Sequence, residues 1–122
     1  MANHNTENKQ AVLDDLPMKI GIVIQSNDPE TVWNAFRFAN TSLNSSHIVK
    51  AFLLGKGVEA EHIKNDEFDV QSVIKTFVEK KGELQACGTC LKSRNMASTV
   101  CPASTMSNLL KIIEESDKVL VF

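Results

Sequence analysis

Short apolar runs alternate with amphipathic helical segments along most of this chain, and that alternation limits the folds it can adopt. Four runs are predicted strands: Lys19–Gln25, His47–Leu54, Glu83–Ala86 and Lys118–Phe122. The first two are almost continuously apolar, which is typical of strands buried on both faces. Strands that are separated by helices favour a parallel sheet covered by helices on both sides. The sequence therefore predicts an α/β fold.

Helix signals occupy the segments between these strands. Asp28 followed by Pro29 is a favoured helix start, and apolar residues then recur at spacings of three and four as far as Leu43. Two later helices are predicted to begin at Asp69, with Gly82 as the stop, and at Ser104 or Thr105. Their predicted buried faces are Val70, Val73, Ile74, Phe77 and Val78 in the first, and Met106, Leu109, Leu110 and Ile113 in the second.

The length and the net charge of the chain limit the classes of protein to which it can belong. The 122 residues suit one domain, which we place at residues 18–122, after a polar N-terminal tail of residues 1–17 that is predicted to be disordered or extended. The net charge of −2 and the scattered basic residues argue against direct nucleic-acid binding. No apolar run approaches the roughly 20 residues that span a bilayer, and the tail lacks a signal-peptide core. We therefore expect no membrane contact and a cytoplasmic location.

A cysteine segment follows the third predicted strand. Functional groups gather at the carboxyl ends of strands in open parallel sheets, and Cys87 falls at such an end. Only a few per cent of a free thiol, with a pKa near 8.5, is ionised at neutral pH, so a reactive cysteine needs nearby donors or cations. The backbone N–H groups of Gly88 and Thr89 and the side chains of Lys92 and Arg94 are the candidates.

From the residues alone, four interpretations of the three cysteines stay open. Cys87 is a nucleophile or sulfur carrier, or Cys87 and Cys90 form a dithiol redox pair. A zinc site would use all three cysteines, including Cys101, with His47 or His62, although structural zinc usually takes two close ligand pairs and the second is missing here. The fourth interpretation is that the cysteines are small buried hydrophobic residues. We expect no resident cofactor or metal.

Two further sequence patterns give weaker evidence about function than the cysteine segment does. The segment Gly55–Ala60 fits the spacing G-x-G-x-x-A, but it follows the second predicted strand rather than the first, so a plain turn is predicted. Trp33 and Phe38 lie off the apolar stripe of the first helix. They are expected either to contact another subunit or to extend the buried face beneath a loop.

The ordered part of the chain resembles the DsrE/DsrF-like family of sulfur-relay proteins. Four segments carry the resemblance in order and spacing: MKIGIVIQSNDPETVWNAFRFA, FLLGKGVEA, LQACGTCLKSRNM and SDKVLVF. The resemblance implies a Rossmann-like (flavodoxin-type) three-layer sandwich with a mostly parallel sheet of about five strands. It also implies a homo-oligomer, either a trimer or a hexamer.

The same resemblance implies a role for each cysteine. Cys87 matches the position that accepts sulfur as a persulfide, and Cys90 matches a second cysteine that is present in part of the family. Cys90 would then be the resolving thiol, with Cys101 in reserve, and the sulfur donor and acceptor would be partner proteins whose identity the sequence does not give. The rival expectations are a non-enzymatic homo-oligomer that binds a ligand or protein and, third, a zinc-binding scaffold.

Overall fold

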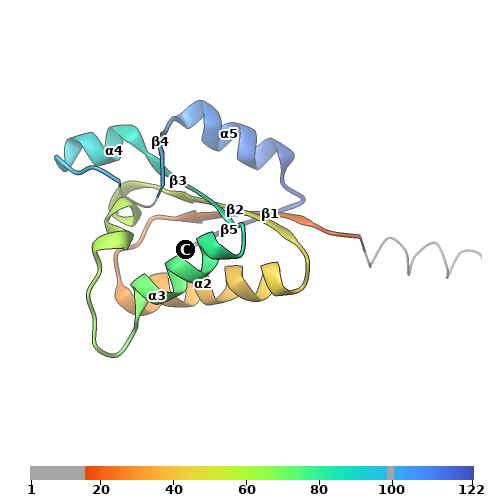
Figure 1. The fold of residues 1–122 in the computed structure, drawn as a ribbon. Helices are drawn as coiled ribbons and strands as arrows, with labels where there is room; N and C mark the ends of the chain where they lie inside the picture. Colours follow the sequence, from red (N-terminus) through yellow and green to blue (C-terminus); the bar gives the residue numbers. More distant parts are fainter. Residues whose placement is uncertain (1–15, 99–100) are drawn as a thin grey trace, which may run out of the picture.

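The described part of the chain, residues 16–98 and 101–122 of a computed structural model, forms one parallel sheet. Five strands lie in the order β4-β3-β2-β1-β5 (Figure 1). Their bounds are β1 Lys19–Ile24, β2 Ile48–Leu53, β3 Glu83–Cys87, β4 Ala103–Ser104 and β5 Lys118–Val121. The predicted α/β class with about five strands is confirmed. Residues 1–15 of the predicted tail lie outside the described residues.

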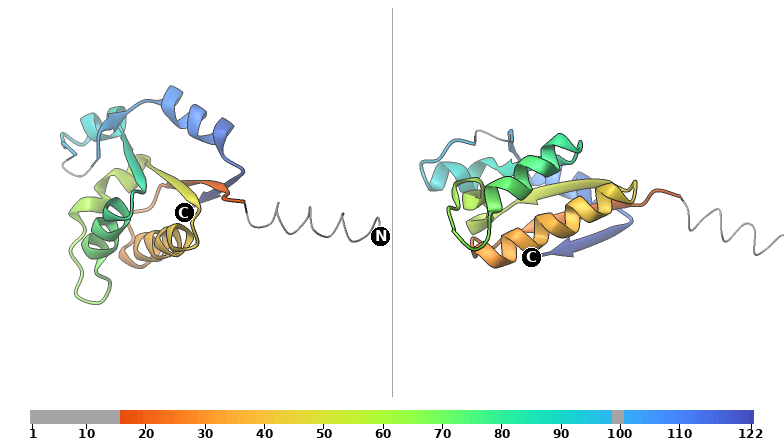
Figure 2. Two further views of the ribbon diagram at one scale, coloured as in Figure 1. Left: turned by 45° about the vertical axis from the view of Figure 1, so that its right-hand side comes forward. Right: turned by 60° about the horizontal axis from the view of Figure 1, so that its bottom comes forward.

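Helices cover both faces of the sheet. On one face lie α2 (Pro29–Asn44) and α3 (Val70–Glu79), and on the other lie α4 (Gly88–Ser93) and α5 (Met106–Glu115), as Figures 1 and 2 show. A 3₁₀ helix, η1 (Gly55–His62), connects β2 to α3. None of the helices in the described ranges is long and apolar enough to cross a membrane.

The predicted helix starts are confirmed at the level of single hydrogen bonds. The carboxylates of Asp28 and Asp69 accept from backbone N–H groups three residues on, and the Thr105 hydroxyl does the same at the start of α5. Each side chain satisfies a donor that has no partner within its helix. These bonds fix where the helices begin. The packing of α2 against α3 includes an edge-to-face contact between Phe36 and Phe77, whose ring centroids are 5.5 Å apart.

The predicted buried face of α5 is correct at Leu109 and wrong at its other three residues. Leu109 and Ile112 are buried, whereas Met106, Leu110 and Ile113 are 59%, 57% and 42% exposed. The helix carries two neighbouring apolar stripes, and only the one containing Ile112 packs against the sheet at β1. The assignment of Val78 to the buried face of α3 is also wrong, since it is 39% exposed at the last turn.

Three local features differ from the sequence-based predictions. The segment after β2 is the helix η1 rather than a plain turn, and the short strand β4, between α4 and α5, was not predicted. The helix α3 ends at Glu79, and the residue with a left-handed backbone is Lys81, at φ 71°, rather than Gly82. The ring of Trp33 packs on that of Phe68, in the loop before α3, with 5.2 Å between the ring centroids. This agrees with the second of the two predicted alternatives for Trp33, an extension of the buried face beneath a loop.

The chain leaves β2 and β3 toward opposite faces of the sheet. After β2 it continues through η1 to α3, and after β3 it enters α4 on the other side (Figure 1). In open parallel sheets, such a divergence creates a crevice at the carboxyl ends of the two strands. Gly55, just after β2, and Cys87, which ends β3, lie at this edge of the sheet.

We predict that Gly57→Ala strongly destabilises the fold. Gly57 in η1 lies against β1 so closely that a Cβ atom would overlap the carbonyl oxygen of Ile24. Because that neighbour is backbone of a buried strand, it cannot move aside cheaply, and we expect a loss of about 2 kcal/mol or more of unfolding free energy. Urea unfolding measures it, with exposed Lys56→Ala as control. Equal stability of the two variants would contradict the prediction.

Candidate functional site

Cys87 occupies the junction where β3 ends and α4 begins. Its backbone is extended, and its Sγ accepts the N–H of Cys90 at 3.5 Å, so it acts as the N-cap of the helix. The thiol is 2% exposed. A buried sulfur with a backbone N–H directed at it therefore lies at the start of α4.

Cys90 connects the segments that follow β2 and β3. The N–H of Gly55 donates to Cys90 Sγ at 3.3 Å, which joins the segment after β2 to the helix after β3. Burial is the largest of the effects that raise the pKa of Cys90, followed by its hydrogen bond with the Cys87 side chain, while Gly55 and Arg94 act in the opposite direction. Cys90 is therefore a protonated thiol at neutral pH.

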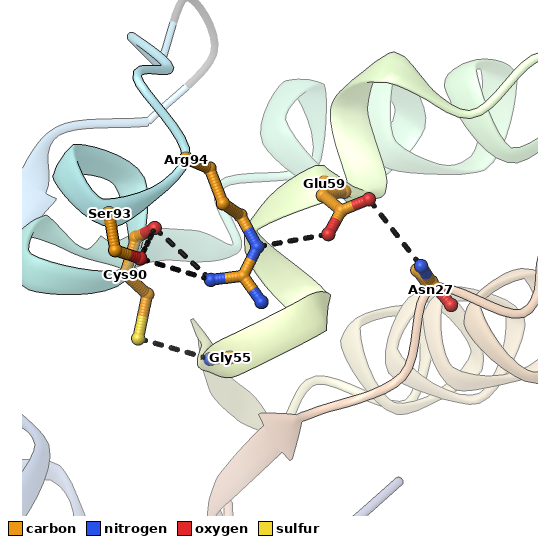
Figure 3. A network of polar contacts seen from close by, with 6 residues as sticks. All are labelled: Asn27, Gly55, Glu59, Cys90, Ser93 and Arg94. Atoms are coloured by element: carbon orange, nitrogen blue, oxygen red, sulfur yellow. Dashed lines mark hydrogen bonds and ion pairs between the residues drawn. The ribbon is translucent and has the colours of Figure 1, made fainter.

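A polar network anchors α4 to η1 beside this cysteine pair (Figure 3). Arg94 Nε donates to Glu59 Oε2 at 3.0 Å, and its Nη1 donates to the Cys90 carbonyl oxygen at 3.3 Å. Asn27, in the segment after β1, donates to the other Glu59 oxygen at 3.4 Å. The hydrogen bond from Arg94, with a smaller contribution from Asn27, lowers the pKa of Glu59. Segments that follow three strands thus meet at one edge of the sheet.

The remaining predicted site residues are distributed around α4. The N–H that reaches the Cys87 sulfur belongs to Cys90 rather than to Gly88 or Thr89. Gly88 begins the helix against the backbone of β4, where a Cβ would stand 3.1 Å from the Ser104 carbonyl oxygen, and Thr89 is exposed. Lys92 lines an open hollow, whereas Arg94 reaches Glu59 and the backbone of Cys90.

Cys101 belongs to a separate group. It is buried, and its Sγ lies 3.1 Å from the Ser98 hydroxyl oxygen. His47 accepts the Met18 N–H and His62 lies beside Glu61, so neither histidine bonds a cysteine. Within residues 16–98 and 101–122, no three of the His, Cys, Asp and Glu side chains are placed to hold a metal ion, so the residues named for the zinc alternative do not gather at one point.

The residues that the sequence analysis missed are those that contact the cysteines from far along the chain. Gly55 and Glu59 were assigned only to a turn, and Asn27 only to the end of a strand. One signal could have found them, since the same rule that places Cys87 at a carboxyl edge places the segments after β1 and β2 beside it.

The fold and this site define a small α/β protein with a cysteine pair at the carboxyl edge of a parallel sheet. The model of the DsrE/DsrF-like family matches residues 18–122. The chain therefore belongs to the DsrE/DsrF-like family, as its resemblance predicted.

Solved structures share this fold at low sequence identity. The ychN protein from E. coli superposes with a TM-score of 0.76 at 21% identity, over 86% of this chain and 99% of its own. A conserved protein of unknown function from Bacteroides thetaiotaomicron gives 0.70 at 20% identity, over 85% and 95%. No curated protein sequence matches the chain. These similarities support the fold alone.

We predict that Arg94→Gln shifts the alkylation of Cys90 to higher pH. Arg94 favours the Cys90 thiolate, so its removal, which also leaves the Glu59 charge unpaired, raises the pKa of Cys90 further. Alkylation at a fixed pH then slows, as peptide mass spectrometry across roughly pH 7–10 would show. Lys92→Gln is the matched control, because Lys92 lines the hollow instead of joining this network. A shift to lower pH in Arg94→Gln would contradict this assignment.

Proposed function

We propose that this chain is a sulfur carrier in which Cys87 accepts sulfur as a persulfide and passes it to a partner protein. The observation that carries the proposal is the position of Cys87 at the end of β3, where its sulfur receives the Cys90 N–H at the start of α4. Membership of the DsrE/DsrF-like family, which is associated with sulfur relay, supports it. Carrier chemistry requires reduced thiols, so we place the protein in the cytoplasm.

The transfer is a displacement at sulfur. The Cys87 thiolate attacks the outer sulfur of a donor persulfide, R–S–S–H, and a new S–S bond forms as the donor S–S bond breaks. The donor thiolate R–S⁻ leaves and takes a proton, and Cys87 carries the persulfide. A thiolate of the acceptor protein removes the outer sulfur by the same displacement, which returns Cys87 to its starting form.

Cys90 offers a second reaction by which the sulfur can leave Cys87. After losing its proton, it would attack the inner sulfur of the Cys87 persulfide, form a Cys87–Cys90 disulfide and release HS⁻. An external thiol must then reduce that disulfide. Because burial and the contact with Cys87 raise the pKa of Cys90, little of its thiolate is present and this release is slow at neutral pH. The arrangement favours a carrier over a protein that releases sulfide.

Access to Cys87 requires local opening, since its thiol is 2% exposed. The segment that follows it directly is α4, a helix of six residues whose first turn is closed by the long Cys90 N–H to Cys87 Sγ bond. Helices this short have little stability of their own, so opening the first turn costs about 0.5–1.5 kcal/mol for each hydrogen bond broken. A docking partner that moves α4 would expose the sulfur.

We expect one additional sulfur atom on the reduced protein after incubation with a cysteine desulfurase and cysteine. Intact mass spectrometry should show a gain of about 32 Da in wild type and in Cys101→Ser, and none in Cys87→Ser. Cys90→Ser should hold the adduct longer, because the internal displacement is lost. An adduct that persists in Cys87→Ser would contradict the proposal. The absence of an adduct in every variant would favour the alternative of a non-enzymatic homo-oligomer that binds a ligand or protein.

We also propose that the chain forms a homo-oligomer through the exposed apolar face beside α5. Met106, Leu110 and Ile113 form one stripe of the helix, and the neighbouring edge strand β5 exposes Val119 and Val121. In the sheet register these two valines lie opposite Gly21 and Val23, and Gly21 faces α5, so the valines lie on the same face. Apolar residues grouped in this way are typical of subunit interfaces.

Leu110→Glu should therefore lower the oligomeric state. A charge in the centre of the stripe is costly to bury, whereas Ser107→Glu places the same charge on an exposed polar position of the same helix. Light scattering coupled to size-exclusion chromatography should show smaller assemblies for Leu110→Glu only. Identical masses for both variants and wild type would exclude this face as the interface.

A further inference from the structure

The Cys101 thiol lies in a chain of polar side chains apart from the Cys87–Cys90 pair. The Ser98 hydroxyl oxygen is 3.1 Å from Cys101 Sγ, accepts the Cys101 N–H at 3.0 Å and lies 3.5 Å from Glu61 Oε2. Cys101 is 7% exposed, and the Glu61 side chain is 3% exposed. A nucleophilic group is thus connected to a buried carboxylate through one hydroxyl.

The hydroxyl of Ser98 fixes the direction of these hydrogen bonds. A serine hydroxyl has one proton to donate and two lone pairs that accept. Its proton is directed to the Glu61 carboxylate, which has none to give when ionised. Its lone pairs therefore receive the N–H and the S–H of Cys101, and the thiol proton already points along the chain toward the carboxylate.

The other end of this chain reaches solvent. His62 Nε2 lies 3.7 Å from Glu61 Oε1, and the His62 side chain is 50% exposed. The titratable or charged groups near the thiol are thus Glu61 and His62, which are connected to it through Ser98, and Lys92, which lines the same hollow as Cys101.

Without a base, Cys101 is a poor nucleophile. Burial raises the pKa of Cys101, and the charge of Glu61 adds to the effect, while the hydrogen bond from Ser98 opposes it. The thiol stays protonated at neutral pH, so reaction requires that its proton be removed as the sulfur attacks.

A hollow gives small molecules a route to this thiol. Its volume is about 580 Å³, within the range of small-molecule sites, and both Ser98 and Cys101 line it. Leu91 and Met96 supply apolar walls, and Lys92 and Asn95 supply polar groups. The lining offers both apolar and polar contacts to a small organic molecule beside the thiol.

We propose that Cys101 is a second reactive thiol, at which Ser98 and Glu61 accept the thiol proton while the sulfur attacks a low-mass disulfide bound in the hollow. The Cys101 S–H proton passes to Ser98 as the Ser98 proton passes to Glu61. The sulfur bonds to one sulfur of R–S–S–R, whose S–S bond breaks, and R–S⁻ leaves and is protonated at the expense of Glu61. The products are Cys101–S–S–R and R–SH, and the reaction is independent of sulfur transfer at Cys87.

The test measures the rate at which 2-hydroxyethyl disulfide, a neutral probe, modifies Cys101 in the full chain, with peptide mass spectrometry to assign the site. At pH 7, Glu61→Gln and Ser98→Ala should each slow the reaction about tenfold or more, since a positioned base is lost. Near pH 10.5, where hydroxide ionises the thiol directly, the rates of the variants should approach that of wild type. Ser98→Thr keeps the hydroxyl and should stay close to wild type at both pH values.

Two outcomes would overturn the proposal. If Glu61 acted only through its negative charge, Glu61→Gln would speed the modification at pH 7, because removal of that charge favours the thiolate. If the variants merely blocked the hollow, they would be slowed by the same factor at both pH values. Circular dichroism and thermal unfolding of Ser98→Thr and Glu61→Gln establish that the compared proteins are folded.

Discussion

Burial of the two central strands is the constraint on which the rest of the structure depends. β1 and β2 are paired along six residues, and their inner positions, among them Ile22, Ile24, Ala51 and Phe52, are almost inaccessible to solvent. Because both faces are buried, a slip by one residue would exchange the side chains that pack on the two faces, such as Ala51 and Phe52, and the different packing of each face fixes the register. The two strands therefore end together, and the pairing of Leu53 with Ala86 brings the end of β3 to the same edge. The N–H of Gly55 reaches the sulfur of Cys90 because of packing in the core, with no contribution from the chemistry of the thiol itself.

The two faces of the sheet are covered unequally. On one side, α2 and α3 pack against each other and against the strands, with Phe36 and Phe77 between them. On the other side, the short helix α4 and one stripe of α5 leave apolar side chains exposed and leave the hollow beside Cys101 open. The face of the sheet covered by α4 and α5 therefore carries both features used in the two proposals: the exposed apolar stripe for a subunit contact and the hollow for a small molecule.

What the sequence predicted depended on local interactions. Asp28, Asp69 and Thr105 cap helices through bonds that close within three residues, so sequence alone was enough to place them. Cys87 was placed at a carboxyl edge because the strand that precedes it is visible as a pattern. The partner of Arg94, by contrast, is Glu59, 35 residues away, and no local pattern connects them. The buried face of α5 was mispredicted for a related reason: two apolar stripes compete, and only tertiary packing decides between them.

Hydrogen-bond direction separates the thiols of this chain. Sulfur that receives N–H groups, as Cys87 receives the Cys90 N–H and Cys90 receives the Gly55 N–H, has donors that stabilise negative charge. Cys101 instead lies beside a hydroxyl backed by a buried carboxylate, and burial together with the charge of Glu61 raises the pKa of its thiol. Exchange at sulfur proceeds through the thiolate, so the site of Cys87 at the start of α4 is the one that suits a thiol that must react with successive partners. The site of Cys101 suits a thiol that reacts only when an electrophile is already in place, because charge separation in a buried site is favourable only if attack and proton transfer occur together.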